Sequence, residues 1–175
     1  MNLKKLVTAA VCTMLMAAVA FTAGCGGEKK SDKKVLKVGM ECAYAPYNWS
    51  QTKADGGAVK IAGSNEYAYG YDVMMAKKLA DSMGADLEIH KIEWDGLAPA
   101  VVSGKIDAAI AGMSITSKRK ETVDFTKPYY YATVVALVKK DSEQAKAQSV
   151  ADLKGSVATS QLNTIWYDQI DQVPD

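Results

Sequence analysis

Hydrophobic and polar residues follow two different spacings along the chain. The run Val35–Met40 is rich in β-formers and predicts a first strand. Farther on, apolar side chains recur at helical spacing and predict a helix, with Val73, Ala76, Leu79, Ala80 and Met83 on one face. Asp72 can cap the start of this helix, and Gly84 stands where a left-handed residue ends one. The polar, glycine-containing stretch 51–66 predicts a surface excursion on a hairpin.

A second strand is predicted at Leu87–Ile92, and Asp95 then caps a second helix that ends at Gly104. Ile106–Ala111 is almost wholly apolar, as expected of a central parallel strand covered on both faces. The order strand, helix, strand, helix, strand predicts an α/β fold with a right-handed, doubly wound parallel layer.

The last part of the chain carries the beginning of a second α/β pattern. A β-branched run at 131–140 predicts a strand, and the polar stretch 139–149 follows. Residues 150–155, 156–160 and 163–170 then predict a short helix, a strand and a helix. One strand and one helix cannot bury both faces of a sheet. We therefore expect this second layer to be incomplete and the chain to be the N-terminal part of a longer protein.

The first residues belong to a different category. Two lysines precede an apolar run, Leu6–Ala20, of about 15 residues, which is shorter than a bilayer span and typical of a secretory signal. Residues 1–24 are therefore interpreted as a signal peptide, with an uncleaved anchor helix as the alternative. The small residues before Cys25 resemble a bacterial lipobox, which implies a lipid-anchored protein on the extracytoplasmic face of the cell membrane. Residues 25–34 would form a flexible tether.

Charge and the scarce reactive side chains exclude several classes of function. The net charge is +1, with 21 basic and 20 acidic residues, and no basic stripe indicates a nucleic-acid partner. The single histidine, His90, has no partner cluster, so neither a metal site nor a cofactor is expected. Cys12 would leave with the signal and Cys25 would carry lipid. Cys42 would then be the only thiol, and we expect it to be buried and inert.

The residues that follow Ile106–Ala111 predict a site for a small acid. Open α/β sheets bind ligands beyond the carboxyl ends of their strands, and this run leads into Gly112 and Ser114. Gly112 lets the backbone approach a ligand, Ser114 offers a hydroxyl and an N–H, and Thr116 can cap the next turn, whose start favours anions. Arg119 can pair with a carboxylate through two hydrogen bonds. Taken alone, however, Arg119 could be a surface side chain at a helix start.

Several motifs together add a family resemblance. They are Val38-Gly39-Met40-Glu41, Tyr44-Ala45-Pro46-Tyr47, Tyr69-Gly70-Tyr71-Asp72, the stretch Trp94 to Tyr130, and Ser149 to Gly155. They resemble bacterial amino-acid-binding proteins of ABC importers, the solute-binding proteins of family 3. The resemblance implies a type II periplasmic-binding-protein-like α/β fold, with a ligand between two lobes. Lobe 1 would occupy residues 35–131, a hinge strand and linker 132–148, and the start of an incomplete lobe 2 would occupy 149–175.

The resemblance also assigns residues to the head group of an amino-acid ligand. Arg119 would hold the α-carboxylate, assisted by the hydroxyl and backbone of Ser114. Gly112 would offer a carbonyl or N–H to the α-ammonium group. Thr164, after Asn163 in a left-handed turn, would close over the carboxylate from lobe 2. An aspartate that binds the α-ammonium group in this family is expected beyond residue 175.

The side chain of the ligand would meet three other residues. Tyr71 would stack on it, Tyr44 would be a second aromatic residue of the cleft, and Glu41 would face a side-chain amine. Tyr71 could instead be a core aromatic residue, and Glu41 a solvated loop acid. We expect the tyrosines at 129–131 to pack near the hinge.

The sequence therefore predicts a protein that captures a polar or cationic L-amino acid by hinge closure and delivers it to an ABC permease in the membrane. Arginine, lysine, histidine and glutamine are the candidate ligands. No enzymatic activity is expected. A dehydratase acting on small carboxylates, with Glu41 as the general acid, is one alternative, and the ligand-sensing domain of a receptor is another.

Overall fold

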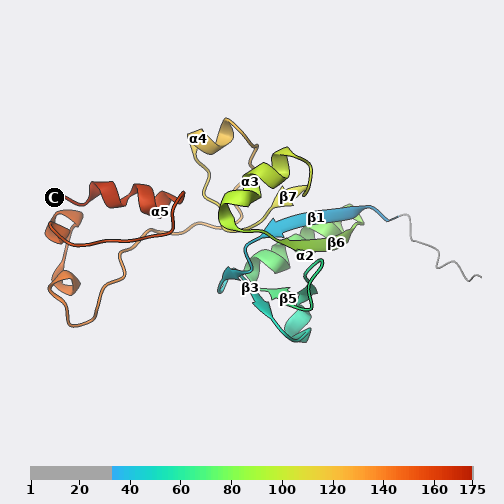
Figure 1. The fold of residues 1–175 in the computed structure, drawn as a ribbon, viewed down its shortest axis with the longest axis horizontal. Helices are drawn as coiled ribbons and strands as arrows, with labels where there is room; N and C mark the ends of the chain where they lie inside the picture. The colour runs from blue at the N-terminus through green and yellow to red at the C-terminus, as the bar shows by residue number, and fades with distance from the viewer. Residues whose placement is uncertain (1–32, 175) are drawn as a thin grey trace, which may run out of the picture. The chain divides into compact units, whose positions relative to one another are not determined.

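The computed structural model describes residues 33–174. These residues form two β-sheets, and the first is a parallel sheet of three strands (Figure 1). Its strands are β1 (Val35–Met40), β6 (Asp86–Lys91) and β7 (Ala108–Ala109), in the order β6-β1-β7. Val35 pairs with Asp86 at one end of β1, and Gly39 pairs with Ala109 near the other. The predicted first strand has the same bounds as β1, and the second is displaced by one residue.

Two helices connect these strands and lie on opposite sides of the sheet (Figure 1). The helix α2 (Tyr71–Met83) connects β1 to β6, and α3 (Trp94–Val102) connects β6 to β7. Because the chain runs from β1 to one neighbour and then across to the other, the three strands form the predicted doubly wound α/β layer. The line between β1 and β7 is the switch point of this layer.

The second sheet is antiparallel and occupies the predicted excursion. Its strands have the order β2-β3-β5-β4, with bounds Ala43–Tyr44 for β2, Asn48–Gln51 for β3, Val59–Lys60 for β4 and Tyr67–Tyr69 for β5. A 3₁₀ turn, η1 (Asp55–Gly57), lies between β3 and β4.

The core lies between β1 and the elements packed on it. Fully buried side chains include Val38 and Met40 of β1, Ile89 of β6 and Leu97 of α3. Burying one such side chain contributes about 1.5–3 kcal/mol. On α2, the positions Val73, Ala76 and Ala80 are buried, whereas Leu79 and Met83 are 40% and 54% exposed. The apolar face of α2 is therefore narrower than the spacing predicted.

The two predicted aspartate caps are wrong. The N-cap of α2 is Gly70 and that of α3 is Glu93, and neither makes a side-chain capping bond. Asp72 lies within the first turn of α2 with its side chain fully buried, and Asp95 lies within α3. The predicted end of the first helix is confirmed, because Gly84 has φ 63° and ψ 29°.

The predicted central strand at Ile106–Ala111 is also wrong in its position. Only Ala108 and Ala109 pair, and they pair with β1 alone, so β7 is an edge strand of this sheet and β1 is the central one. The apolar character of the run arises because its flanking residues Ile106 and Ala111 are buried. Burial therefore extends beyond the hydrogen-bonded residues.

The segment after Tyr131 contains short helical turns and no strand within the described residues. The side chains of Tyr131, Val135 and Leu137 are 83%, 79% and 98% exposed, so the strands predicted at 131–140 and 156–160 are absent. A strand needs a neighbour for its backbone hydrogen bonds, and none lies beside these runs. The short helices of the second half of the chain are α4 (Ser117–Lys120), η2 (Glu143–Lys146), η3 (Val150–Leu153), α5 (Ile165–Asp168) and η4 (Ile170–Gln172).

The predicted signal peptide, 1–24, and the predicted lipid attachment at Cys25 lie outside the described residues, as does most of the tether. Within residues 33–174, no helix has the length and apolar character that crossing a membrane requires.

We expect Gly70→Ala to destabilise the fold strongly. Gly70 has φ 126°, and a Cβ atom there would lie 2.3 Å from the carbonyl oxygen of Tyr47. Such a backbone conformation alone costs about 1–3 kcal/mol in a residue with a side chain, and the contact adds to that. Urea unfolding of the purified protein measures the loss. Gly63→Ala is the control, because Gly63 has φ 70° and no atom within 4 Å of the added Cβ. An equal loss in both variants would contradict a role for the close contact.

Candidate functional site

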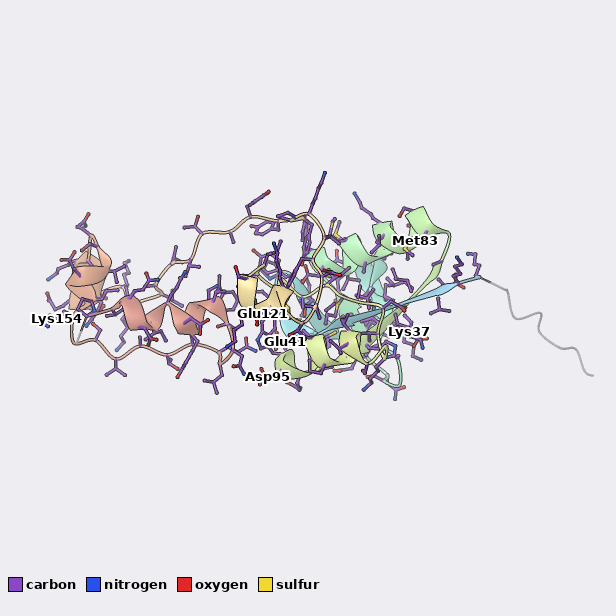
Figure 2. All side chains as sticks on the ribbon, turned by 90° about the horizontal axis from the view of Figure 1, so that it is seen from above. Lys37, Glu41, Met83, Asp95, Glu121 and Lys154 are labelled. Atoms are coloured by element: carbon purple, nitrogen blue, oxygen red, sulfur yellow. The ribbon has the colours of Figure 1, made fainter. Side chains whose placement is uncertain are left out.

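The candidate site lies at the carboxyl ends of β1 and β7, on the switch point between them. Glu41 follows β1 directly and lies away from Lys37 along that strand (Figure 2). Gly112 follows β7 after two residues. Two neighbouring parallel strands with crossovers to opposite sides leave a crevice at this position. The fold therefore brings Glu41 and Gly112 to the same edge of the sheet.

A chain of hydrogen-bonded side chains, buried except at Tyr129, connects two backbone N–H groups at this edge. One belongs to Cys42, which follows Glu41, and the other belongs to Gly112. The centre of this hydrogen-bonded chain is Asp72, whose carboxylate accepts a hydrogen bond from Asn48 Nδ2 at 2.7 Å and another from the Tyr129 hydroxyl at 2.8 Å. Asn48 Oδ1 in turn accepts from the backbone N–H of Cys42 at 2.8 Å. The Tyr129 hydroxyl oxygen accepts from the backbone N–H of Gly112 at 2.9 Å. We call these side chains, Asn48, Asp72 and Tyr129, the Asp72 relay.

Burial and hydrogen bonding shift the pKa of the central Asp72 carboxyl in opposite directions. Burial raises the pKa of Asp72, and the hydrogen bonds from Asn48 and Tyr129 lower it. Burial together with the Asp72 carboxylate raises the pKa of Tyr129, so its hydroxyl keeps its proton and remains a donor. Tyr129 therefore does more than pack near the hinge, the role expected from the sequence.

Arg119 is held beside the turn formed by residues 112–116. The predicted cap is confirmed, because Thr116 Oγ1 accepts from the backbone N–H of Arg119 at 3.1 Å. The guanidinium donates from Nη1 to the carbonyl of Ser114 at 2.7 Å and from Nη2 to the carbonyl of Asn163 at 2.9 Å. Its central carbon lies 5.3 Å from the ring centroid of Trp94, which is within cation–π range.

The charge of Arg119 is not neutralised by a carboxylate within the described part of the chain, where no ion pair involves it. Partial burial lowers the pKa of Arg119, and the more distant Asp168 carboxylate opposes that shift. A guanidinium has five N–H donors, and the hydrogen bonds to Ser114 and Asn163 use two of them. Because α4 has only four residues, the cation at this place is Arg119 itself and not a helix dipole.

A cavity of about 220 Å³ is lined by Trp94, the residue on whose ring the Arg119 guanidinium lies, but not by Arg119 itself. Glu41, Tyr44 and Trp94 form its wall on one side, and Gln161 and Trp166 form the other. The Glu41 carboxylate accepts a hydrogen bond from Gln161 Nε2 at 3.0 Å. The Glu41 carboxylate thus faces this cavity directly, whereas the Arg119 guanidinium adjoins it only through the ring of Trp94. The carboxylate suits a small molecule with a polar or basic end.

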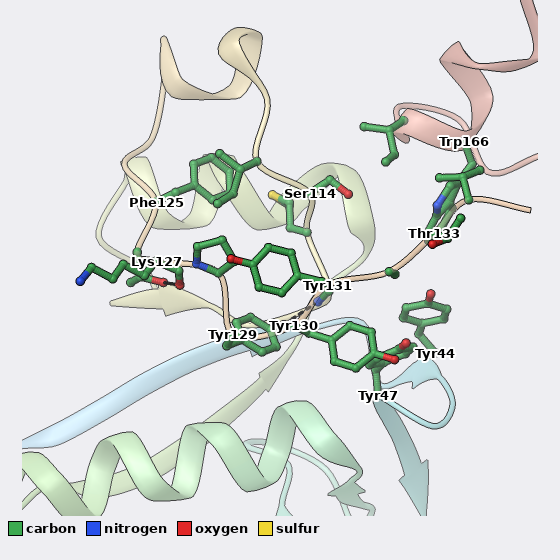
Figure 3. A pocket seen from close by; sticks show the side chains of 18 residues that line it. Tyr44, Tyr47, Ser114, Phe125, Lys127, Tyr129, Tyr130, Tyr131, Thr133 and Trp166 are labelled. Atoms are coloured by element: carbon green, nitrogen blue, oxygen red, sulfur yellow. Dashed lines mark hydrogen bonds between the residues drawn. The ribbon is translucent and has the colours of Figure 1, made fainter. Parts of the chain in front are cut away.

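A second cavity, of about 310 Å³, lies beyond Tyr44 (Figure 3). Its wall comes from residues 112–115 and 125–134, with Tyr44, Tyr47, Ile165 and Trp166. Tyr44 stacks on Tyr47 with ring centroids 4.9 Å apart and lies 5.8 Å from the ring of Trp166. Tyr44 and Trp166 line both cavities and separate them.

The structure brings the predicted site residues together only in part. Glu41 and Tyr44 line the smaller cavity, and Gly112 and Ser114 line the larger one. Tyr71, Arg119 and Thr164 line neither cavity. The ring of Tyr71 stacks on Tyr129 at 6.1 Å, and the Tyr71 hydroxyl donates to the backbone carbonyl of Tyr129 at 3.1 Å.

Two of the residues predicted to bind the head group of the amino acid already have hydrogen-bond partners within the protein. The N–H of Gly112 donates to the hydroxyl oxygen of Tyr129, so the carbonyl of Gly112 is the group available to a ligand. Thr164 is 2% exposed and is the N-cap of α5. Its hydroxyl donates to the carbonyl of Gln161 at 2.7 Å and accepts from the N–H of Tyr167 at 3.2 Å. Asn163 has φ 60°, as expected for the left-handed turn before it.

The sequence did not single out Trp94, Trp166 or the Asp72 relay as parts of the site. Trp94 was visible as the start of a motif, but its spacing gave no sign that the Arg119 guanidinium would lie on its ring. Trp94 Nε1 also donates to the Asn163 carbonyl at 3.0 Å, the same oxygen that Arg119 contacts. Asp72 was assigned to a cap because the sequence does not show that a helix side chain faces the core.

The described residues contain no group of three or more histidine, cysteine or acidic side chains that could hold a metal ion. His90 is on β6 with its Nε2 2.7 Å from Glu88 Oε1. It lies away from the residues of both cavities.

Comparisons with known proteins identify the family of the chain. The chain matches the family model of the bacterial extracellular solute-binding proteins, family 3, over residues 36–173. It is 34% identical over 136 residues to the arginine-binding extracellular protein ArtP of Bacillus subtilis (strain 168), which is 78% of this chain and 47% of that protein. It is 32% identical over 153 residues to the ABC transporter arginine-binding protein 1 of Escherichia coli (strain K12), or 87% of this chain and 52% of that protein.

Among solved structures, the chain is similar to the crystal structure of the ancestral amino acid-binding protein AncCDT-1, a precursor of cyclohexadienyl dehydratase. The TM-score is 0.66 at 34% identity, and the match covers 79% of this chain and 56% of that chain. This chain therefore spans about half the length of the relatives it matches.

We expect the Cys42 thiol to resist alkylation in the folded protein. It is 2% exposed, and burial raises its pKa to about 11, so little of the reactive thiolate is present at pH 8.5. Mass spectrometry of the Cys42 peptide after iodoacetamide treatment, with and without urea, measures this. The thiol should react within minutes in urea and remain unmodified in buffer. Equal labelling in both conditions would contradict the buried, protonated state.

Proposed function

The chain belongs to the bacterial extracellular solute-binding proteins of family 3, and from this premise we propose that it is the amino-acid-binding component of an ABC importer. Its described residues have the α/β periplasmic-binding-protein fold. The proposed ligand is an L-amino acid with a polar or cationic side chain. A membrane permease would receive it, and a lipid at Cys25 would hold the protein on the extracytoplasmic face of the membrane.

The observation that carries this proposal is the state of Arg119. A partly buried guanidinium lies on Trp94 with only carbonyl partners among the described residues. Carbonyls fix its direction but leave its charge uncompensated. A ligand carboxylate could take the remaining donors, and each charge-assisted hydrogen bond contributes about 1.5–3 kcal/mol. We propose two roles here. Arg119 binds the ligand carboxylate, and the carbonyl of Gly112 accepts a hydrogen bond from the α-ammonium group.

Glu41 supports a polar or cationic side chain on the ligand. It lines the smaller cavity with Tyr44 and Trp94, and its present partner is the neutral amide of Gln161. A ligand guanidinium or ammonium could replace that amide and would add charge pairing and contact with the faces of the rings. The relatives named for arginine are in keeping with this choice.

Contacts from residues 161–166 support closure of a second lobe over the ligand. Gln161 reaches Glu41, and the carbonyl of Asn163 reaches both Arg119 and Trp94. Asn163 Nδ2 also donates to Asp95 at 2.9 Å. A ligand held by both sides of such a contact stabilises the closed state, because it binds that state better than the open one. We propose that lobe 1 spans 35–131 and that lobe 2 begins near 149.

A carboxylate-acting dehydratase is a second candidate, favoured by the likeness to AncCDT-1, which is described as a precursor of cyclohexadienyl dehydratase. Elimination needs a general acid or base within hydrogen-bond reach of the reacting group. Glu41 is the acid that lines the smaller cavity, and binding a ligand cation explains it equally well. Incubating the protein with a cyclohexadienyl carboxylate and following its dehydration by absorbance separates the two functions, since a binding protein produces no turnover.

We predict that Arg119→Ala lowers the affinity for amino acids by about 100-fold or more, because loss of about 3 kcal/mol or more is expected when two charge-assisted hydrogen bonds are removed. Isothermal titration calorimetry of the purified protein with arginine, lysine, histidine and glutamine measures this. Lys120→Ala, on the same short helix with an exposed side chain, is the matched control. Unchanged affinity in Arg119→Ala would remove the basis of the proposed function.

We predict that Glu41→Gln discriminates among ligands. The substitution keeps the size of the side chain and removes its charge, so binding of arginine or lysine should fall by about tenfold or more, in line with the loss of one charged hydrogen bond. Binding of glutamine should change little. The same titrations report the ratio of affinities before and after the substitution. A uniform loss for all ligands would mean that Glu41 shapes the site without reading the side chain.

A further inference from the structure

The two ends of the Asp72 relay share an unusual feature. One end is the backbone N–H of Cys42, and the other is the backbone N–H of Gly112. Both residues have a positive φ, 56° at Cys42 and 63° at Gly112. Each of them stands where the chain leaves a parallel strand of the first sheet and turns toward the site. The relay therefore holds the peptide group at both turns.

The residues beside these two turns are the ones proposed to bind the ligand. Cys42 lies between Glu41 and Tyr44, and Gly112 opens the turn that carries Ser114. A residue with positive φ and a side chain is strained by about 1–2 kcal/mol, so the conformation of Cys42 persists only with support from its surroundings. The hydrogen bond from its N–H to Asn48 supplies that support.

Both carboxylate oxygens of Asp72, and both the oxygen and the nitrogen of the Asn48 amide, have a hydrogen-bond partner in the relay. Asp72 is fully buried and Asn48 is 1% exposed, so an unpaired group in either would be costly. Each oxygen of the Asp72 carboxylate accepts from one arm, Oδ2 from Asn48 and Oδ1 from Tyr129. The Tyr129 hydroxyl uses its proton toward Asp72 and a lone pair toward Gly112. The direction of every hydrogen bond is thereby fixed by the negative charge at the centre.

We infer that Asp72 and Tyr129 are positioning residues for ligand binding. They fix the peptide group that joins Ala111 to Gly112, and they thereby set the direction in which the Gly112 carbonyl, in the next peptide group, faces the α-ammonium group of the ligand. The inference rests on the proposed function. Neither residue needs to contact the ligand for this role. Because the α-ammonium group is common to all amino acids, the relay affects affinity for all of them alike, whereas Glu41 reads the side chain.

The test compares Tyr129→Phe and Asp72→Asn with Tyr67→Phe in the purified protein. Tyr129→Phe removes one hydroxyl, which separates Gly112 from Asp72. Asp72→Asn keeps the shape of the centre but offers an N–H to one of two donors, so it disturbs both arms. Tyr67 lies on β5 outside both cavities, and its phenylalanine variant loses the same atom. Two-dimensional ¹H–¹⁵N NMR reports the amides of Gly112 and Cys42, and calorimetry reports affinity.

We expect Tyr129→Phe to shift the Gly112 amide proton upfield and to lower the affinity for arginine, lysine and glutamine by the same factor, about tenfold, as expected for about 1.4 kcal/mol. Asp72→Asn should shift the amides of both Gly112 and Cys42 and weaken binding at least as much. Tyr67→Phe should change neither reading. If Tyr129→Phe does not fold, judged by its thermal unfolding, the same two readings on Asp72→Asn decide.

Affinity that stays the same while the Gly112 amide shifts would overturn the inference, and so would a loss confined to cationic ligands. Arg119→Ala, titrated alongside, separates this outcome from failure of the proposed function. If Arg119→Ala abolishes binding and the relay variants do not weaken it, only the positioning role is wrong. If Arg119→Ala binds normally, the proposed function itself is wrong.

Discussion

The buried carboxylate of Asp72 is the constraint on which the arrangement of the site depends. A charge away from water is tolerated only when hydrogen-bond donors surround it, and here the donors come from Asn48 and Tyr129. These two residues lie far from Asp72 in sequence and on different elements. Their side chains meet at the first turn of α2, and these contacts link the second sheet and the segment before residue 131 to the parallel layer.

The position of this carboxylate connects the fold to the chemistry of the site. The parallel layer places the carboxyl ends of β1 and β7 side by side at its switch point. The first turn of α2 lies beneath them, and its buried aspartate orients the backbone that leaves each strand. Arg119 is fixed separately, by carbonyls and by the ring of Trp94. The scaffold and Arg119, the cation proposed to bind the ligand carboxylate, thus have independent supports.

Local patterns in the sequence predicted the elements whose causes are local. The strand Val35–Met40, the end of α2 at Gly84 and the cap at Thr116 depend on spacing and on single residues, and the structure confirms them. The role of Asp72 could not be predicted, because an aspartate near the start of a helical pattern is typical of a cap, and the pattern does not show that the helix begins earlier, at Tyr71, with Asp72 facing the core. The strand predicted at 131–140 is absent because pairing requires a distant partner, which propensity alone does not provide.

Tyr129 forms hydrogen bonds at its backbone and at its hydroxyl with two consecutive residues of α2, Tyr71 and Asp72. The hydroxyl of Tyr71 donates to its backbone carbonyl, and the carboxylate of Asp72 accepts from its own hydroxyl. The ring stacks on that of Tyr71 between these two points. These contacts hold the Tyr129 side chain against the helix, whereas its neighbour Tyr130 is half-exposed. A displacement of the first turn of α2 would therefore also displace the Tyr129 hydroxyl, and with it the partner of the Gly112 N–H.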